Sequence, residues 1–526
     1  MSADDLTGAR RYNAAEWMVD RHVAAGRGDA VALRCQGRST TYAALLRALW
    51  RTQQLLAALS IAPGERIAMV VRDDEAFPSL FLGAQRSGVI PVPLSTMLKG
   101  PALAEIIADA GARVLAISAE YGAAAPDIVA GAPALEHVVV CGDPSAVDID
   151  ARQVARHVWA EHAAADEAPV ADTTAESPGF WLYSSGTTGR PKGVMHRQRD
   201  PQATFDTYAR AVLRVTADDR FLSVAKLFFA FGLGNALTFP LGAGATAILH
   251  PDPPTPRAIA ELIAAESPTL FFSSPGFCAA LLDADPDPTI FASVRATVTA
   301  GEALPANLQT RFTALTGSPV LDGIGSTELL HIFISNTLEE VVPGSSGRVV
   351  PGYEAELRDA DDNPVRDADT PGFLHVRGAS AASGYWQRPE ATAAAFCEDG
   401  WVRTGDVYTR TRDDNWCFLG RNNDMIKAGG IWVSPAEVEN ALIGHPSVRE
   451  AAVVGARDAQ GLETVVAFVV PAAGATIDPA ALERHCRGAV AAFKRPRRIE
   501  IVDALPKTAT GKIRRFELRA RLEQER

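Results

Sequence analysis

The sequence has few cysteines, and none of them suggests a bridge or a metal site. Six cysteines are scattered over 526 residues, with no CxxC pair and no zinc-type spacing. This pattern excludes a disulfide-rich secreted domain and a zinc module, and it predicts reduced thiols in a cytoplasmic protein. The first ten residues, MSADDLTGAR, are acidic and polar, so we expect no signal peptide.

Positive charge is also in short supply. The chain has 51 Lys and Arg against 63 Asp and Glu, which gives a net charge of −12 and a pI of about 5.4. Proteins that bind nucleic acids usually carry clustered basic surface, so we expect no nucleic-acid partner. An anionic small molecule remains possible if lysines and arginines gather locally.

Long hydrophobic runs are nearly absent. The longest uncharged stretch, 227–249, contains four glycines together with Asn235 and Pro240. This composition suits a buried loop, helix and strand better than a helix across a bilayer. We therefore expect no membrane association.

Several common catalytic motifs are missing. The chain has no GxSxG nucleophile elbow and no GxxxxGK[ST] phosphate loop. The segment HVWAEH, from His157 to His162, resembles an inverted zinc motif but has one residue too many. The two histidines would then fall on different faces of a helix, so we predict a plain surface helix here.

The apolar residues that are present predict an α/β fold. Short apolar runs typical of buried strands lie near Ile67, Val114, Val138, Phe271 and Val298, and Ala-rich amphipathic stretches separate most of them. Such alternation indicates a parallel, doubly wound sheet. Ligands of these sheets bind at loops that follow the strand ends.

The pattern of apolar and polar residues changes twice along the chain. After Val349 apolar and polar residues alternate around turn residues, and from Trp432 onward helix and strand patterns mix in a basic tail of about a hundred residues, enough for a small core. We predict a large N-terminal domain over residues 1–422, with doubly wound mixed sheets and a β-rich part at 350–422. A small, mobile α+β domain would follow at 423–526, with a hinge near Asn423.

The loop YSSGTTGRPKG, from Tyr183 to Gly193, is composed almost entirely of small, hydroxyl-bearing and basic residues. Glycines let backbone amides approach an anion, and Ser and Thr hydroxyls donate to phosphate oxygens. A flexible surface turn is the alternative, because the same residue types are common in loops. The candidates for phosphate binding are Ser184, Ser185, Gly186, Thr187, Thr188 and Lys192.

Five further motifs follow this loop in order: GEAL at Gly301, DGIGSTE at 322–328, RTGD at 403–406, GRNNDMIKAGG from Gly420, and PKTATGK ending at Lys512. Together they resemble the signature of the adenylate-forming superfamily, which includes acyl-CoA synthetases, luciferases and peptide-synthetase adenylation domains. AKLFFAFGLGN at 225–235 and GIGSTELLHIFISN at 323–336 resemble benzoate-CoA ligases. The resemblance spans nearly the whole chain.

The resemblance implies an enzyme that uses ATP, Mg²⁺ and coenzyme A. A carboxylate attacks the α-phosphorus of ATP to give an acyl-adenylate and pyrophosphate, and the thiol of coenzyme A then displaces AMP. Glu328 would hold the metal beside Thr327, and Lys512 would stabilise charge during transfer. The other residues implied for ATP are Gly301, Glu302, Ala303, Asp322, Gly323, Ile324, Asp406 and Arg421, with Asp406 on the ribose hydroxyls.

For the second half-reaction the resemblance implies rotation of the small domain about the hinge. Lys427, Gly429 and Gly430 would then line the path of the pantetheine arm. The basic residues Lys494, Arg495, Arg497 and Arg498 are candidates for the phosphates of coenzyme A, although they could equally form a solvated surface.

The acid pocket implied by the resemblance is uncharged, and its residues are Ala230, Phe231, Gly232, Gly325, His331 and Ile332. It lacks the Asp that amino-acid activators use, so we expect an aromatic carboxylate as substrate. Phe228 and Phe229 could belong to the pocket wall or to the core. Benzoate-CoA ligases commonly have Tyr where this chain has Phe231, and loss of that hydroxyl favours a plain or lightly substituted benzoate.

Two departures and several alternatives remain. Ile324 stands where an aromatic residue often stacks on adenine, and Asn423 stands where Asp or Lys is usual at the hinge. A hydroxy- or aminobenzoate-CoA ligase, or an enzyme that loads an aryl acid onto a carrier protein, would show many of the same motifs. Oligomeric state is open, with a homodimer as one possibility.

Overall fold

A computed structural model provides the structure of the protein. It describes residues 11–150, 154–161, 167–185, 191–428, 431–457, 463–472, 474–507 and 513–524. Within these ranges every helix is too short or too polar to cross a lipid bilayer.

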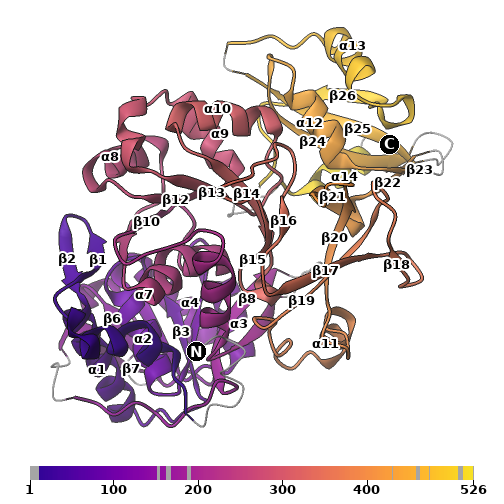
Figure 1. Cartoon of the computed structure of the whole chain (residues 1–526). Coiled ribbons are helices and arrows are strands. Elements are labelled where there is room, and N and C mark those ends of the chain that lie inside the picture. The colour runs from indigo at the N-terminus through magenta and orange to yellow at the C-terminus, as the bar shows by residue number, and fades with distance from the viewer. Residues whose placement is uncertain are drawn as a thin grey trace.

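A nine-stranded mixed sheet forms the centre of the larger part of the chain (Figure 1). Strands β1, β11, β10, β12, β13 and β14 lie side by side in this order and pair in parallel. The outer strands β2, β15 and β16 are antiparallel to their neighbours. In spatial order the strands are β16 (Arg348–Val349), β15 (Ile332–Ser335), β14 (Val320–Gly325), β13 (Ala296–Thr299), β12 (Leu270–Ser273), β10 (Arg220–Ser223), β11 (Thr246–Leu249), β1 (Val31–Cys35) and β2 (Arg38–Thr41).

Both faces of this sheet are buried. Because side chains alternate along a strand, Phe271 faces one cluster and Leu270 and Phe272 face another. The first cluster includes residues of helices α8 (Pro256–Glu266), α9 (Pro275–Asp283) and α10 (Ala306–Thr316). The second includes aromatic residues from the neighbouring segments, such as Tyr208 and Tyr353.

A second sheet has five parallel strands, which are β4 (Ile90–Pro93), β3 (Arg66–Val70), β5 (Val114–Ser118), β6 (His137–Cys141) and β7 (Ala155–Val158). Helices α1 (Tyr42–Ala58) and α2 (Ala76–Arg86) pack on one face, and α3 (Gly100–Ala110) and α4 (Ala125–Gly131) pack on the other. The predicted doubly wound α/β architecture is therefore confirmed in both sheets.

The segment 227–249 is buried, as expected from its composition. It forms helices α6 (Ala230–Leu233) and α7 (Phe239–Ala243) with a π-helical stretch between them, and then strand β11. By contrast, the predicted surface helix at HVWAEH is wrong. Residues Ala155–Val158 form β7, and a short 3₁₀ turn follows at Trp159–Glu161. Among the described strands β7 pairs with β6 alone, so its exposed edge position allows the polar residues that suggested a helix.

Two further sections follow toward the C-terminus, and their described residues form sheets of five, two and three strands. The β-rich section contains β17 (Tyr353–Arg358), β18 (Pro364–Val365), β19 (Gly372–Gly378), β20 (Val402–Arg410) and β21 (Trp416–Arg421), all antiparallel, with helix α11 (Pro389–Ala395). The last section contains β22 (Ile426–Ala428), β23 (Ile431–Val433), α12 (Pro435–Ile443), β24 (Val448–Arg457), β25 (Glu463–Pro471), α13 (Pro479–Ala489), β26 (Arg498–Ile501) and α14 (Arg515–Gln524).

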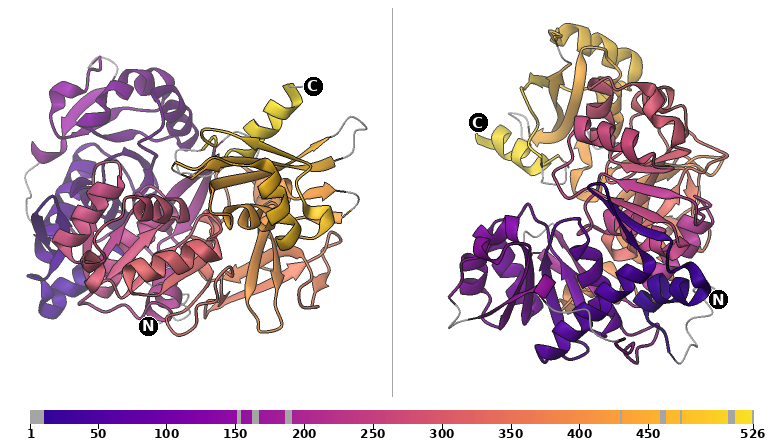
Figure 2. Two further views of the ribbon diagram at one scale, coloured as in Figure 1. Left: turned by 90° about the horizontal axis from the view of Figure 1, so that it is seen from above. Right: turned by 90° about the vertical axis from the view of Figure 1, so that its left-hand side faces the viewer.

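The C-terminal section has hydrophobic clusters of its own on both faces of the β24–β25–β26 sheet. Figures 1 and 2 show it as a yellow lobe next to the orange β-rich section and away from the purple five-stranded sheet. One hydrogen bond to the larger part runs from Asn307 Nδ2 to Ile443 O, at 3.2 Å. A boundary at residue 422 and mobility about Asn423 stay predictions.

Helices α1 and α2 approach closely at Gly83, and this contact can be tested. A Cβ added at Gly83 would lie 2.5 Å from Thr52 Cβ and 3.1 Å from Leu49 O. We expect Gly83→Ala to lower the free energy of unfolding by about 1–3 kcal/mol, because the helices must separate. The matched control is Gly488→Ala in α13, where an added Cβ meets nothing within 4 Å, so a gain of about 0.5–1 kcal/mol is expected. Denaturant unfolding measures both, and equal stability of the two variants would contradict the packing argument.

Candidate active site

The phosphate-loop motif spans a β-hairpin. Strands β8 (Pro178–Ser185) and β9 (Pro191–Arg197) pair antiparallel, with Ser184 opposite Lys192 and Ser185 opposite Pro191. Gly186, Thr187 and Thr188 lie outside the described residues. The hairpin therefore brings Ser184 and Lys192, eight positions apart in the sequence, to the same end of a rigid ribbon.

The base of this hairpin is tied to helix α3. Tyr183 donates a hydrogen bond from its hydroxyl to Asp109 Oδ2 at 2.8 Å, and Arg388 donates to Asp109 Oδ1 at 2.5 Å. Trp386 Nε1 donates to the Asp109 carbonyl at 3.1 Å. Because the Asp109 carboxylate accepts from two segments, it fixes the hairpin against residues 386–388.

Thr327 and Glu328 lie on a 3₁₀ turn, Thr327–Leu329, directly after β14. Ser326 caps the turn by accepting a hydrogen bond from Leu329 N at 3.3 Å. The Glu328 side chain is half-buried, and its Oε1 accepts a hydrogen bond from the Tyr385 hydroxyl at 2.8 Å. Lys192 Nζ lies 5.1 Å from the centre of the same tyrosine ring.

The motifs predicted to bind adenine and the metal follow two neighbouring strands of the nine-stranded sheet. β13 and β14 are parallel neighbours, with Thr299 opposite Asp322. The residues after each strand therefore emerge on the same side, where ligands of such sheets bind. The loop of Gly301, Glu302 and Ala303 and the turn of Thr327 and Glu328 thus both follow strands that end at this edge, and Gly301 has the φ of +93° that favours glycine.

Asp322 is buried beneath this edge. Burial raises its pKa to about 8, although Thr299 Oγ1 donates a hydrogen bond to Asp322 Oδ1 at 3.1 Å. Gly323 and Ile324 follow on β14, and Ile324 is half-buried. An added Cβ at Gly323 would lie 3.0 Å from both Ile332 Cγ2 and Ile334 O, so only glycine fits without a shift of β15.

Asp406 and Arg421 form an ion pair across β20 and β21. They are opposite each other in the sheet, and Arg421 Nε lies 3.0 Å from Asp406 Oδ1. Arg421 also donates to the Thr404 carbonyl at 2.8 Å. The Asp406 side chain is buried and Arg421 is half exposed, so Arg421 fixes a carboxylate that lies beneath the surface of the β-rich section.

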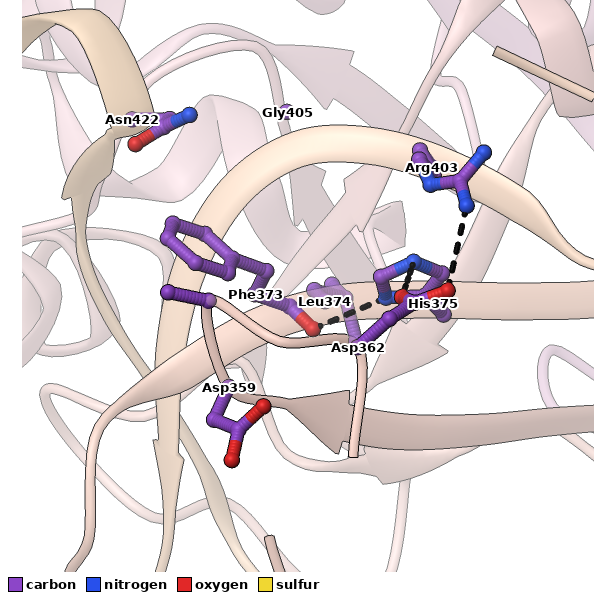
Figure 3. A pocket seen from close by; sticks show the side chains of 9 residues that line it. Asp359, Asp362, Phe373, Leu374, His375, Arg403, Gly405 and Asn422 are labelled. Carbon is purple, nitrogen blue, oxygen red and sulfur yellow. Dashed lines mark hydrogen bonds and ion pairs between the residues drawn. The ribbon is translucent and has the colours of Figure 1, made fainter. Parts of the chain in front are cut away.

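A cavity of about 310 Å³ lies beside this pair (Figure 3). Two of the lining residues contact the Asp362 carboxylate. Arg403 Nη2 lies 3.2 Å from Asp362 Oδ2, and His375 Nε2 lies 3.5 Å from Asp362 Oδ1. Since a carbonyl oxygen only accepts, His375 Nδ1 donates to the Phe373 carbonyl at 3.0 Å. The lining also includes Gly405 and Asn422, next to Asp406 and Asn423, and no residue of the predicted acid pocket.

The predicted acid-pocket residues come from two segments that converge. The rings of Phe231 and His331 lie 5.5 Å apart between centroids. An added Cβ at Gly325 would lie 2.5 Å from His331 O, and one at Gly232 would lie 2.1 Å from Lys226 O. Ala230 and Phe231 are half-buried, whereas Gly232, His331 and Ile332 are buried. Phe228 is buried and Phe229 half-buried.

His331 is the polar group at the buried end of this pocket. Its Nε2 is 3.1 Å from Asn235 Oδ1, and its ring packs against Phe239 at 4.5 Å and Tyr208 at 5.3 Å. Burial among these groups lowers the pKa of His331 to about 3. The His331 imidazole is therefore neutral at physiological pH.

The segment before α6 is held by a buried carboxylate that the sequence did not single out. Asp73 accepts a hydrogen bond from Leu227 N at 3.2 Å, and burial raises the pKa of Asp73 to about 7. Lys226 Nζ donates to the carbonyls of His250 and Asp252 at 2.6 and 2.7 Å. These contacts anchor the residues just before Phe228–Gly232.

His196, Asp200 and Tyr385 were likewise missed. His196 Nδ1 lies 3.0 Å from Asp200 Oδ2, and its Nε2 donates to the Thr327 carbonyl at 2.8 Å. Tyr385 and Glu328 are 57 positions apart in the sequence. No sequence pattern predicts contacts between residues so far apart. Only His196 could have been noticed from the sequence, because it closely follows the predicted phosphate loop, on β9.

The remaining predicted residues are distributed over the C-terminal section. Lys427 is exposed on β22, and Gly429, Gly430 and Lys512 lie outside the described residues. Lys494 Nζ donates to Glu437 Oε2 at 2.6 Å, and Arg498 lies 2.6 Å from Glu500. Any anion bound by these two cations would therefore compete with a carboxylate.

Comparison with known proteins gives matches over almost the whole chain. A model of the AMP-binding enzyme family matches residues 20–386, and one of the AMP-binding enzyme C-terminal domain matches residues 437–512. The benzoate–CoA ligase of Thauera aromatica is 41% identical over 97% of this chain and 96% of its own. The 4-hydroxybenzoate–CoA/benzoate–CoA ligase of Rhodopseudomonas palustris is 40% identical over 97% and 94%.

Among solved structures, a benzoate CoA ligase from Burkholderia xenovorans LB400 superimposes with a TM-score of 0.88 at 38% identity. The match covers 97% of this chain and 100% of that one. The architecture described above is therefore shared along its full length with a solved enzyme.

The neutrality of His331 can be tested by its pH dependence. An ordinary pKa near 6.5 in the unfolded chain and one of about 3 in the fold mean that only the unfolded state binds a proton between these values. Protonation of the unfolded chain at His331 therefore lowers the free energy of unfolding as pH falls below 6.5, by up to about 1.4 kcal/mol per pH unit. We expect His331→Gln to lose less unfolding free energy than the wild type between pH 6.5 and 5. Parallel curves for the two proteins over this range would contradict a buried neutral imidazole.

Proposed function

The chain belongs to the family of AMP-binding enzymes, and we propose that it is an AMP-forming ligase that joins benzoate, or a lightly substituted benzoate, to coenzyme A. The observation that carries this proposal is the full-length similarity to benzoate–CoA ligases. The neutral, aromatic-lined pocket of Phe231 and His331 supports an uncharged ring as its occupant.

In the first half-reaction a carboxylate oxygen of the acid would attack the α-phosphorus of ATP. The bond from that phosphorus to the bridging oxygen of pyrophosphate breaks, which leaves an acyl-adenylate. Ser184 and Lys192, at one end of the β8–β9 hairpin, would bind the departing phosphates. Gly186, Thr187, Thr188, the Ser185 hydroxyl and Lys512 would complete this set.

The residues present fit one magnesium ion. Among the described residues no group of three or more His, Cys, Asp or Glu side chains could hold a metal, and Mg²⁺ typically uses one or two carboxylates together with substrate phosphates. Glu328 supplies such a carboxylate, with Tyr385 on Oε1. A bound Mg²⁺ would neutralise the charge of the phosphates, and Glu328 would orient it.

The nucleotide would lie along the carboxyl edge of β13 and β14. Gly301, Glu302 and Ala303 would line the adenine on one side, and Asp322, Gly323 and Ile324 would line it on the other. Arg421 holds the Asp406 carboxylate in one orientation, which would suit it to accept hydrogen bonds from the ribose hydroxyls.

In the second half-reaction the thiol of coenzyme A would attack the acyl carbonyl and AMP would leave. Lys427, Gly429 and Gly430 would flank the pantetheine, after rotation of residues 423–526 about a hinge at Asn423. Asn423 lies in a 3₁₀ turn, and the adjacent Asp424 pairs with Arg519 at 2.9 Å. Lys494, Arg495, Arg497 and Arg498 would meet the phosphates of coenzyme A only after Lys494 leaves Glu437.

The cytoplasmic location expected from the sequence also stays a proposal. All six cysteines are free thiols in the structure, and Cys35, Cys141, Cys278 and Cys486 are buried. This state fits a reducing compartment.

The activity is tested by measuring pyrophosphate release from ATP and Mg²⁺ with benzoate, with and without coenzyme A. The same assay covers hydroxy-, amino- and fluorobenzoates and aliphatic acids. We expect turnover that requires coenzyme A and prefers an aryl acid. Adenylate formation without an acyl-CoA product would favour a carrier-dependent activator, and a preference for hydroxy- or aminobenzoate would replace benzoate as the substrate.

Phe231 provides the test of ring selectivity. Its ring packs against His331, and it lacks the hydroxyl that Tyr would place there. We expect Phe231→Tyr to lower kcat/KM for benzoate and to improve it for a hydroxybenzoate, shifting the ratio by about 10-fold or more, because a new polar group rewards a hydrogen-bonding substituent. Unchanged selectivity across the panel would contradict the assignment of Phe231 to the pocket.

A further inference from the structure

Tyr385 contacts both charged side chains, Lys192 and Glu328, that are proposed for the phosphate site. It is 8% exposed. Its hydroxyl donates to Glu328 Oε1 at 2.8 Å, and Lys192 Nζ lies 5.1 Å from the centre of its ring. One aromatic side chain thus contacts the proposed metal ligand through its hydroxyl and the proposed phosphate ligand through its ring.

The direction of the hydrogen bond follows from the chemistry of the groups. The Tyr385 phenol carries a proton at physiological pH, and its hydroxyl donates a hydrogen bond to the Glu328 carboxylate, which only accepts. This bond holds one carboxylate oxygen and sets the orientation of the other.

Lys192 and Glu328 carry opposite charges, and both contact this one side chain. If the ring were removed, the flexible ammonium and the carboxylate could form a direct ion pair, which would occupy both groups. A cation–π contact holds a lysine more weakly than a carboxylate would. Lys192 can therefore leave the ring for a phosphate group at little cost.

The backbone keeps Tyr385 in register with both partners. Residues 383–386 run along β9, with hydrogen bonds from Met195 N to Gly384 O at 3.0 Å and from Trp386 N to Gly193 O at 2.8 Å. On the other side Ala382 N donates to Glu328 O at 2.8 Å. Tyr385 N also donates to Thr392 Oγ1 at 3.0 Å, so the ring cannot shift independently of the hairpin or the turn.

From this arrangement we propose that Tyr385 is a positioning residue for adenylate formation: it keeps Lys192 apart from Glu328 and aims the Glu328 carboxylate at the metal that accompanies ATP. The inference rests on the proposed function and adds a residue to its first half-reaction. It makes no contribution to the second half-reaction, in which no pyrophosphate is bound.

Two substitutions separate the hydroxyl from the ring. Tyr385→Phe removes the hydrogen bond and keeps the spacer, whereas Tyr385→Leu removes both. Tyr42→Phe is the matched control, because Tyr42 is buried and donates to the Ala245 carbonyl at 2.8 Å in another part of the molecule. Each protein is assayed for adenylate formation at varied MgATP and for conversion of synthetic benzoyl-adenylate and coenzyme A to the thioester.

Metal affinity is measured independently of turnover, from the electron paramagnetic resonance of Mn²⁺ with a non-hydrolysable ATP analogue. For Tyr385→Phe we expect about 10-fold weaker Mn²⁺ binding, since a hydrogen bond to a charged group is lost, with an unchanged KM for the nucleotide. For Tyr385→Leu we expect the nucleotide KM to rise as well. In both variants, and in the Tyr42→Phe control, we expect the rate of benzoyl-adenylate conversion to stay within about 2-fold of the wild type. The reason is that changes away from the reacting groups usually have small effects.

A double variant tests the separation of charges directly. In Tyr385→Leu we expect Lys192 to pair with Glu328, so the added Lys192→Ala change should restore part of the Mn²⁺ affinity. Wild-type Mn²⁺ binding in both single variants, or no recovery in the double variant, would overturn the proposal. Equal losses in both half-reactions would also overturn it, because they would show general damage to the fold. If the wild-type protein fails to convert benzoyl-adenylate, the proposed function is at fault, while the Mn²⁺ measurement still decides the role of Tyr385.

Discussion

The site depends on the fixed position of the short turn Thr327–Leu329. Each carbonyl oxygen of this turn accepts a hydrogen bond from one of two other segments: Thr327 from His196 Nε2, Glu328 from Ala382 N, and Leu329 from Ser380 Oγ, all at 2.8 Å. A turn at the edge of a sheet would otherwise leave these acceptors to water. Because the bonds reach strand β9 and the segment after β19, the turn links the nine-stranded sheet to the phosphate hairpin and the β-rich section.

The same turn also orients the acid pocket. Leu330 follows it with a φ of +67° and a ψ of −38°, a conformation that is costly for a residue with a branched side chain. The chain reverses direction there, so Glu328 faces Tyr385 while His331, three residues later, packs against Phe231 and Phe239. The unfavourable backbone conformation of Leu330 therefore accompanies a reversal of the chain that points Glu328 and His331 toward different surroundings.

The sequence was sufficient wherever a feature depended on local pattern. The buried strands near Ile67, Val114 and Phe271 follow from apolar runs, and the segment 227–249 follows from its glycines and Pro240. The failure at HVWAEH has the same origin, since an edge strand with one covered face resembles a surface helix in a short window. Tyr385, His196 and Asp73 could not be predicted, because their roles arise from contacts between segments far apart in the chain. The functional assignments of the motif residues rest on resemblance and await the experiments above.

The proposed acid pocket and the proposed phosphate site differ in their electrostatics. At the proposed phosphate site Lys192 and the Glu328 carboxylate both contact Tyr385, one through its ring and the other through its hydroxyl. Around His331 burial removes the charge, since an imidazolium among Phe231, Phe239 and Tyr208 would lack compensation. A benzoate bound between these regions would place its ring in the neutral part and its carboxylate toward the charged part. This division would let a chain with a net charge of −12 accept the three anionic substrates of the proposed reaction, benzoate, ATP and coenzyme A, because the local arrangement of a few groups decides the binding and the total charge does not.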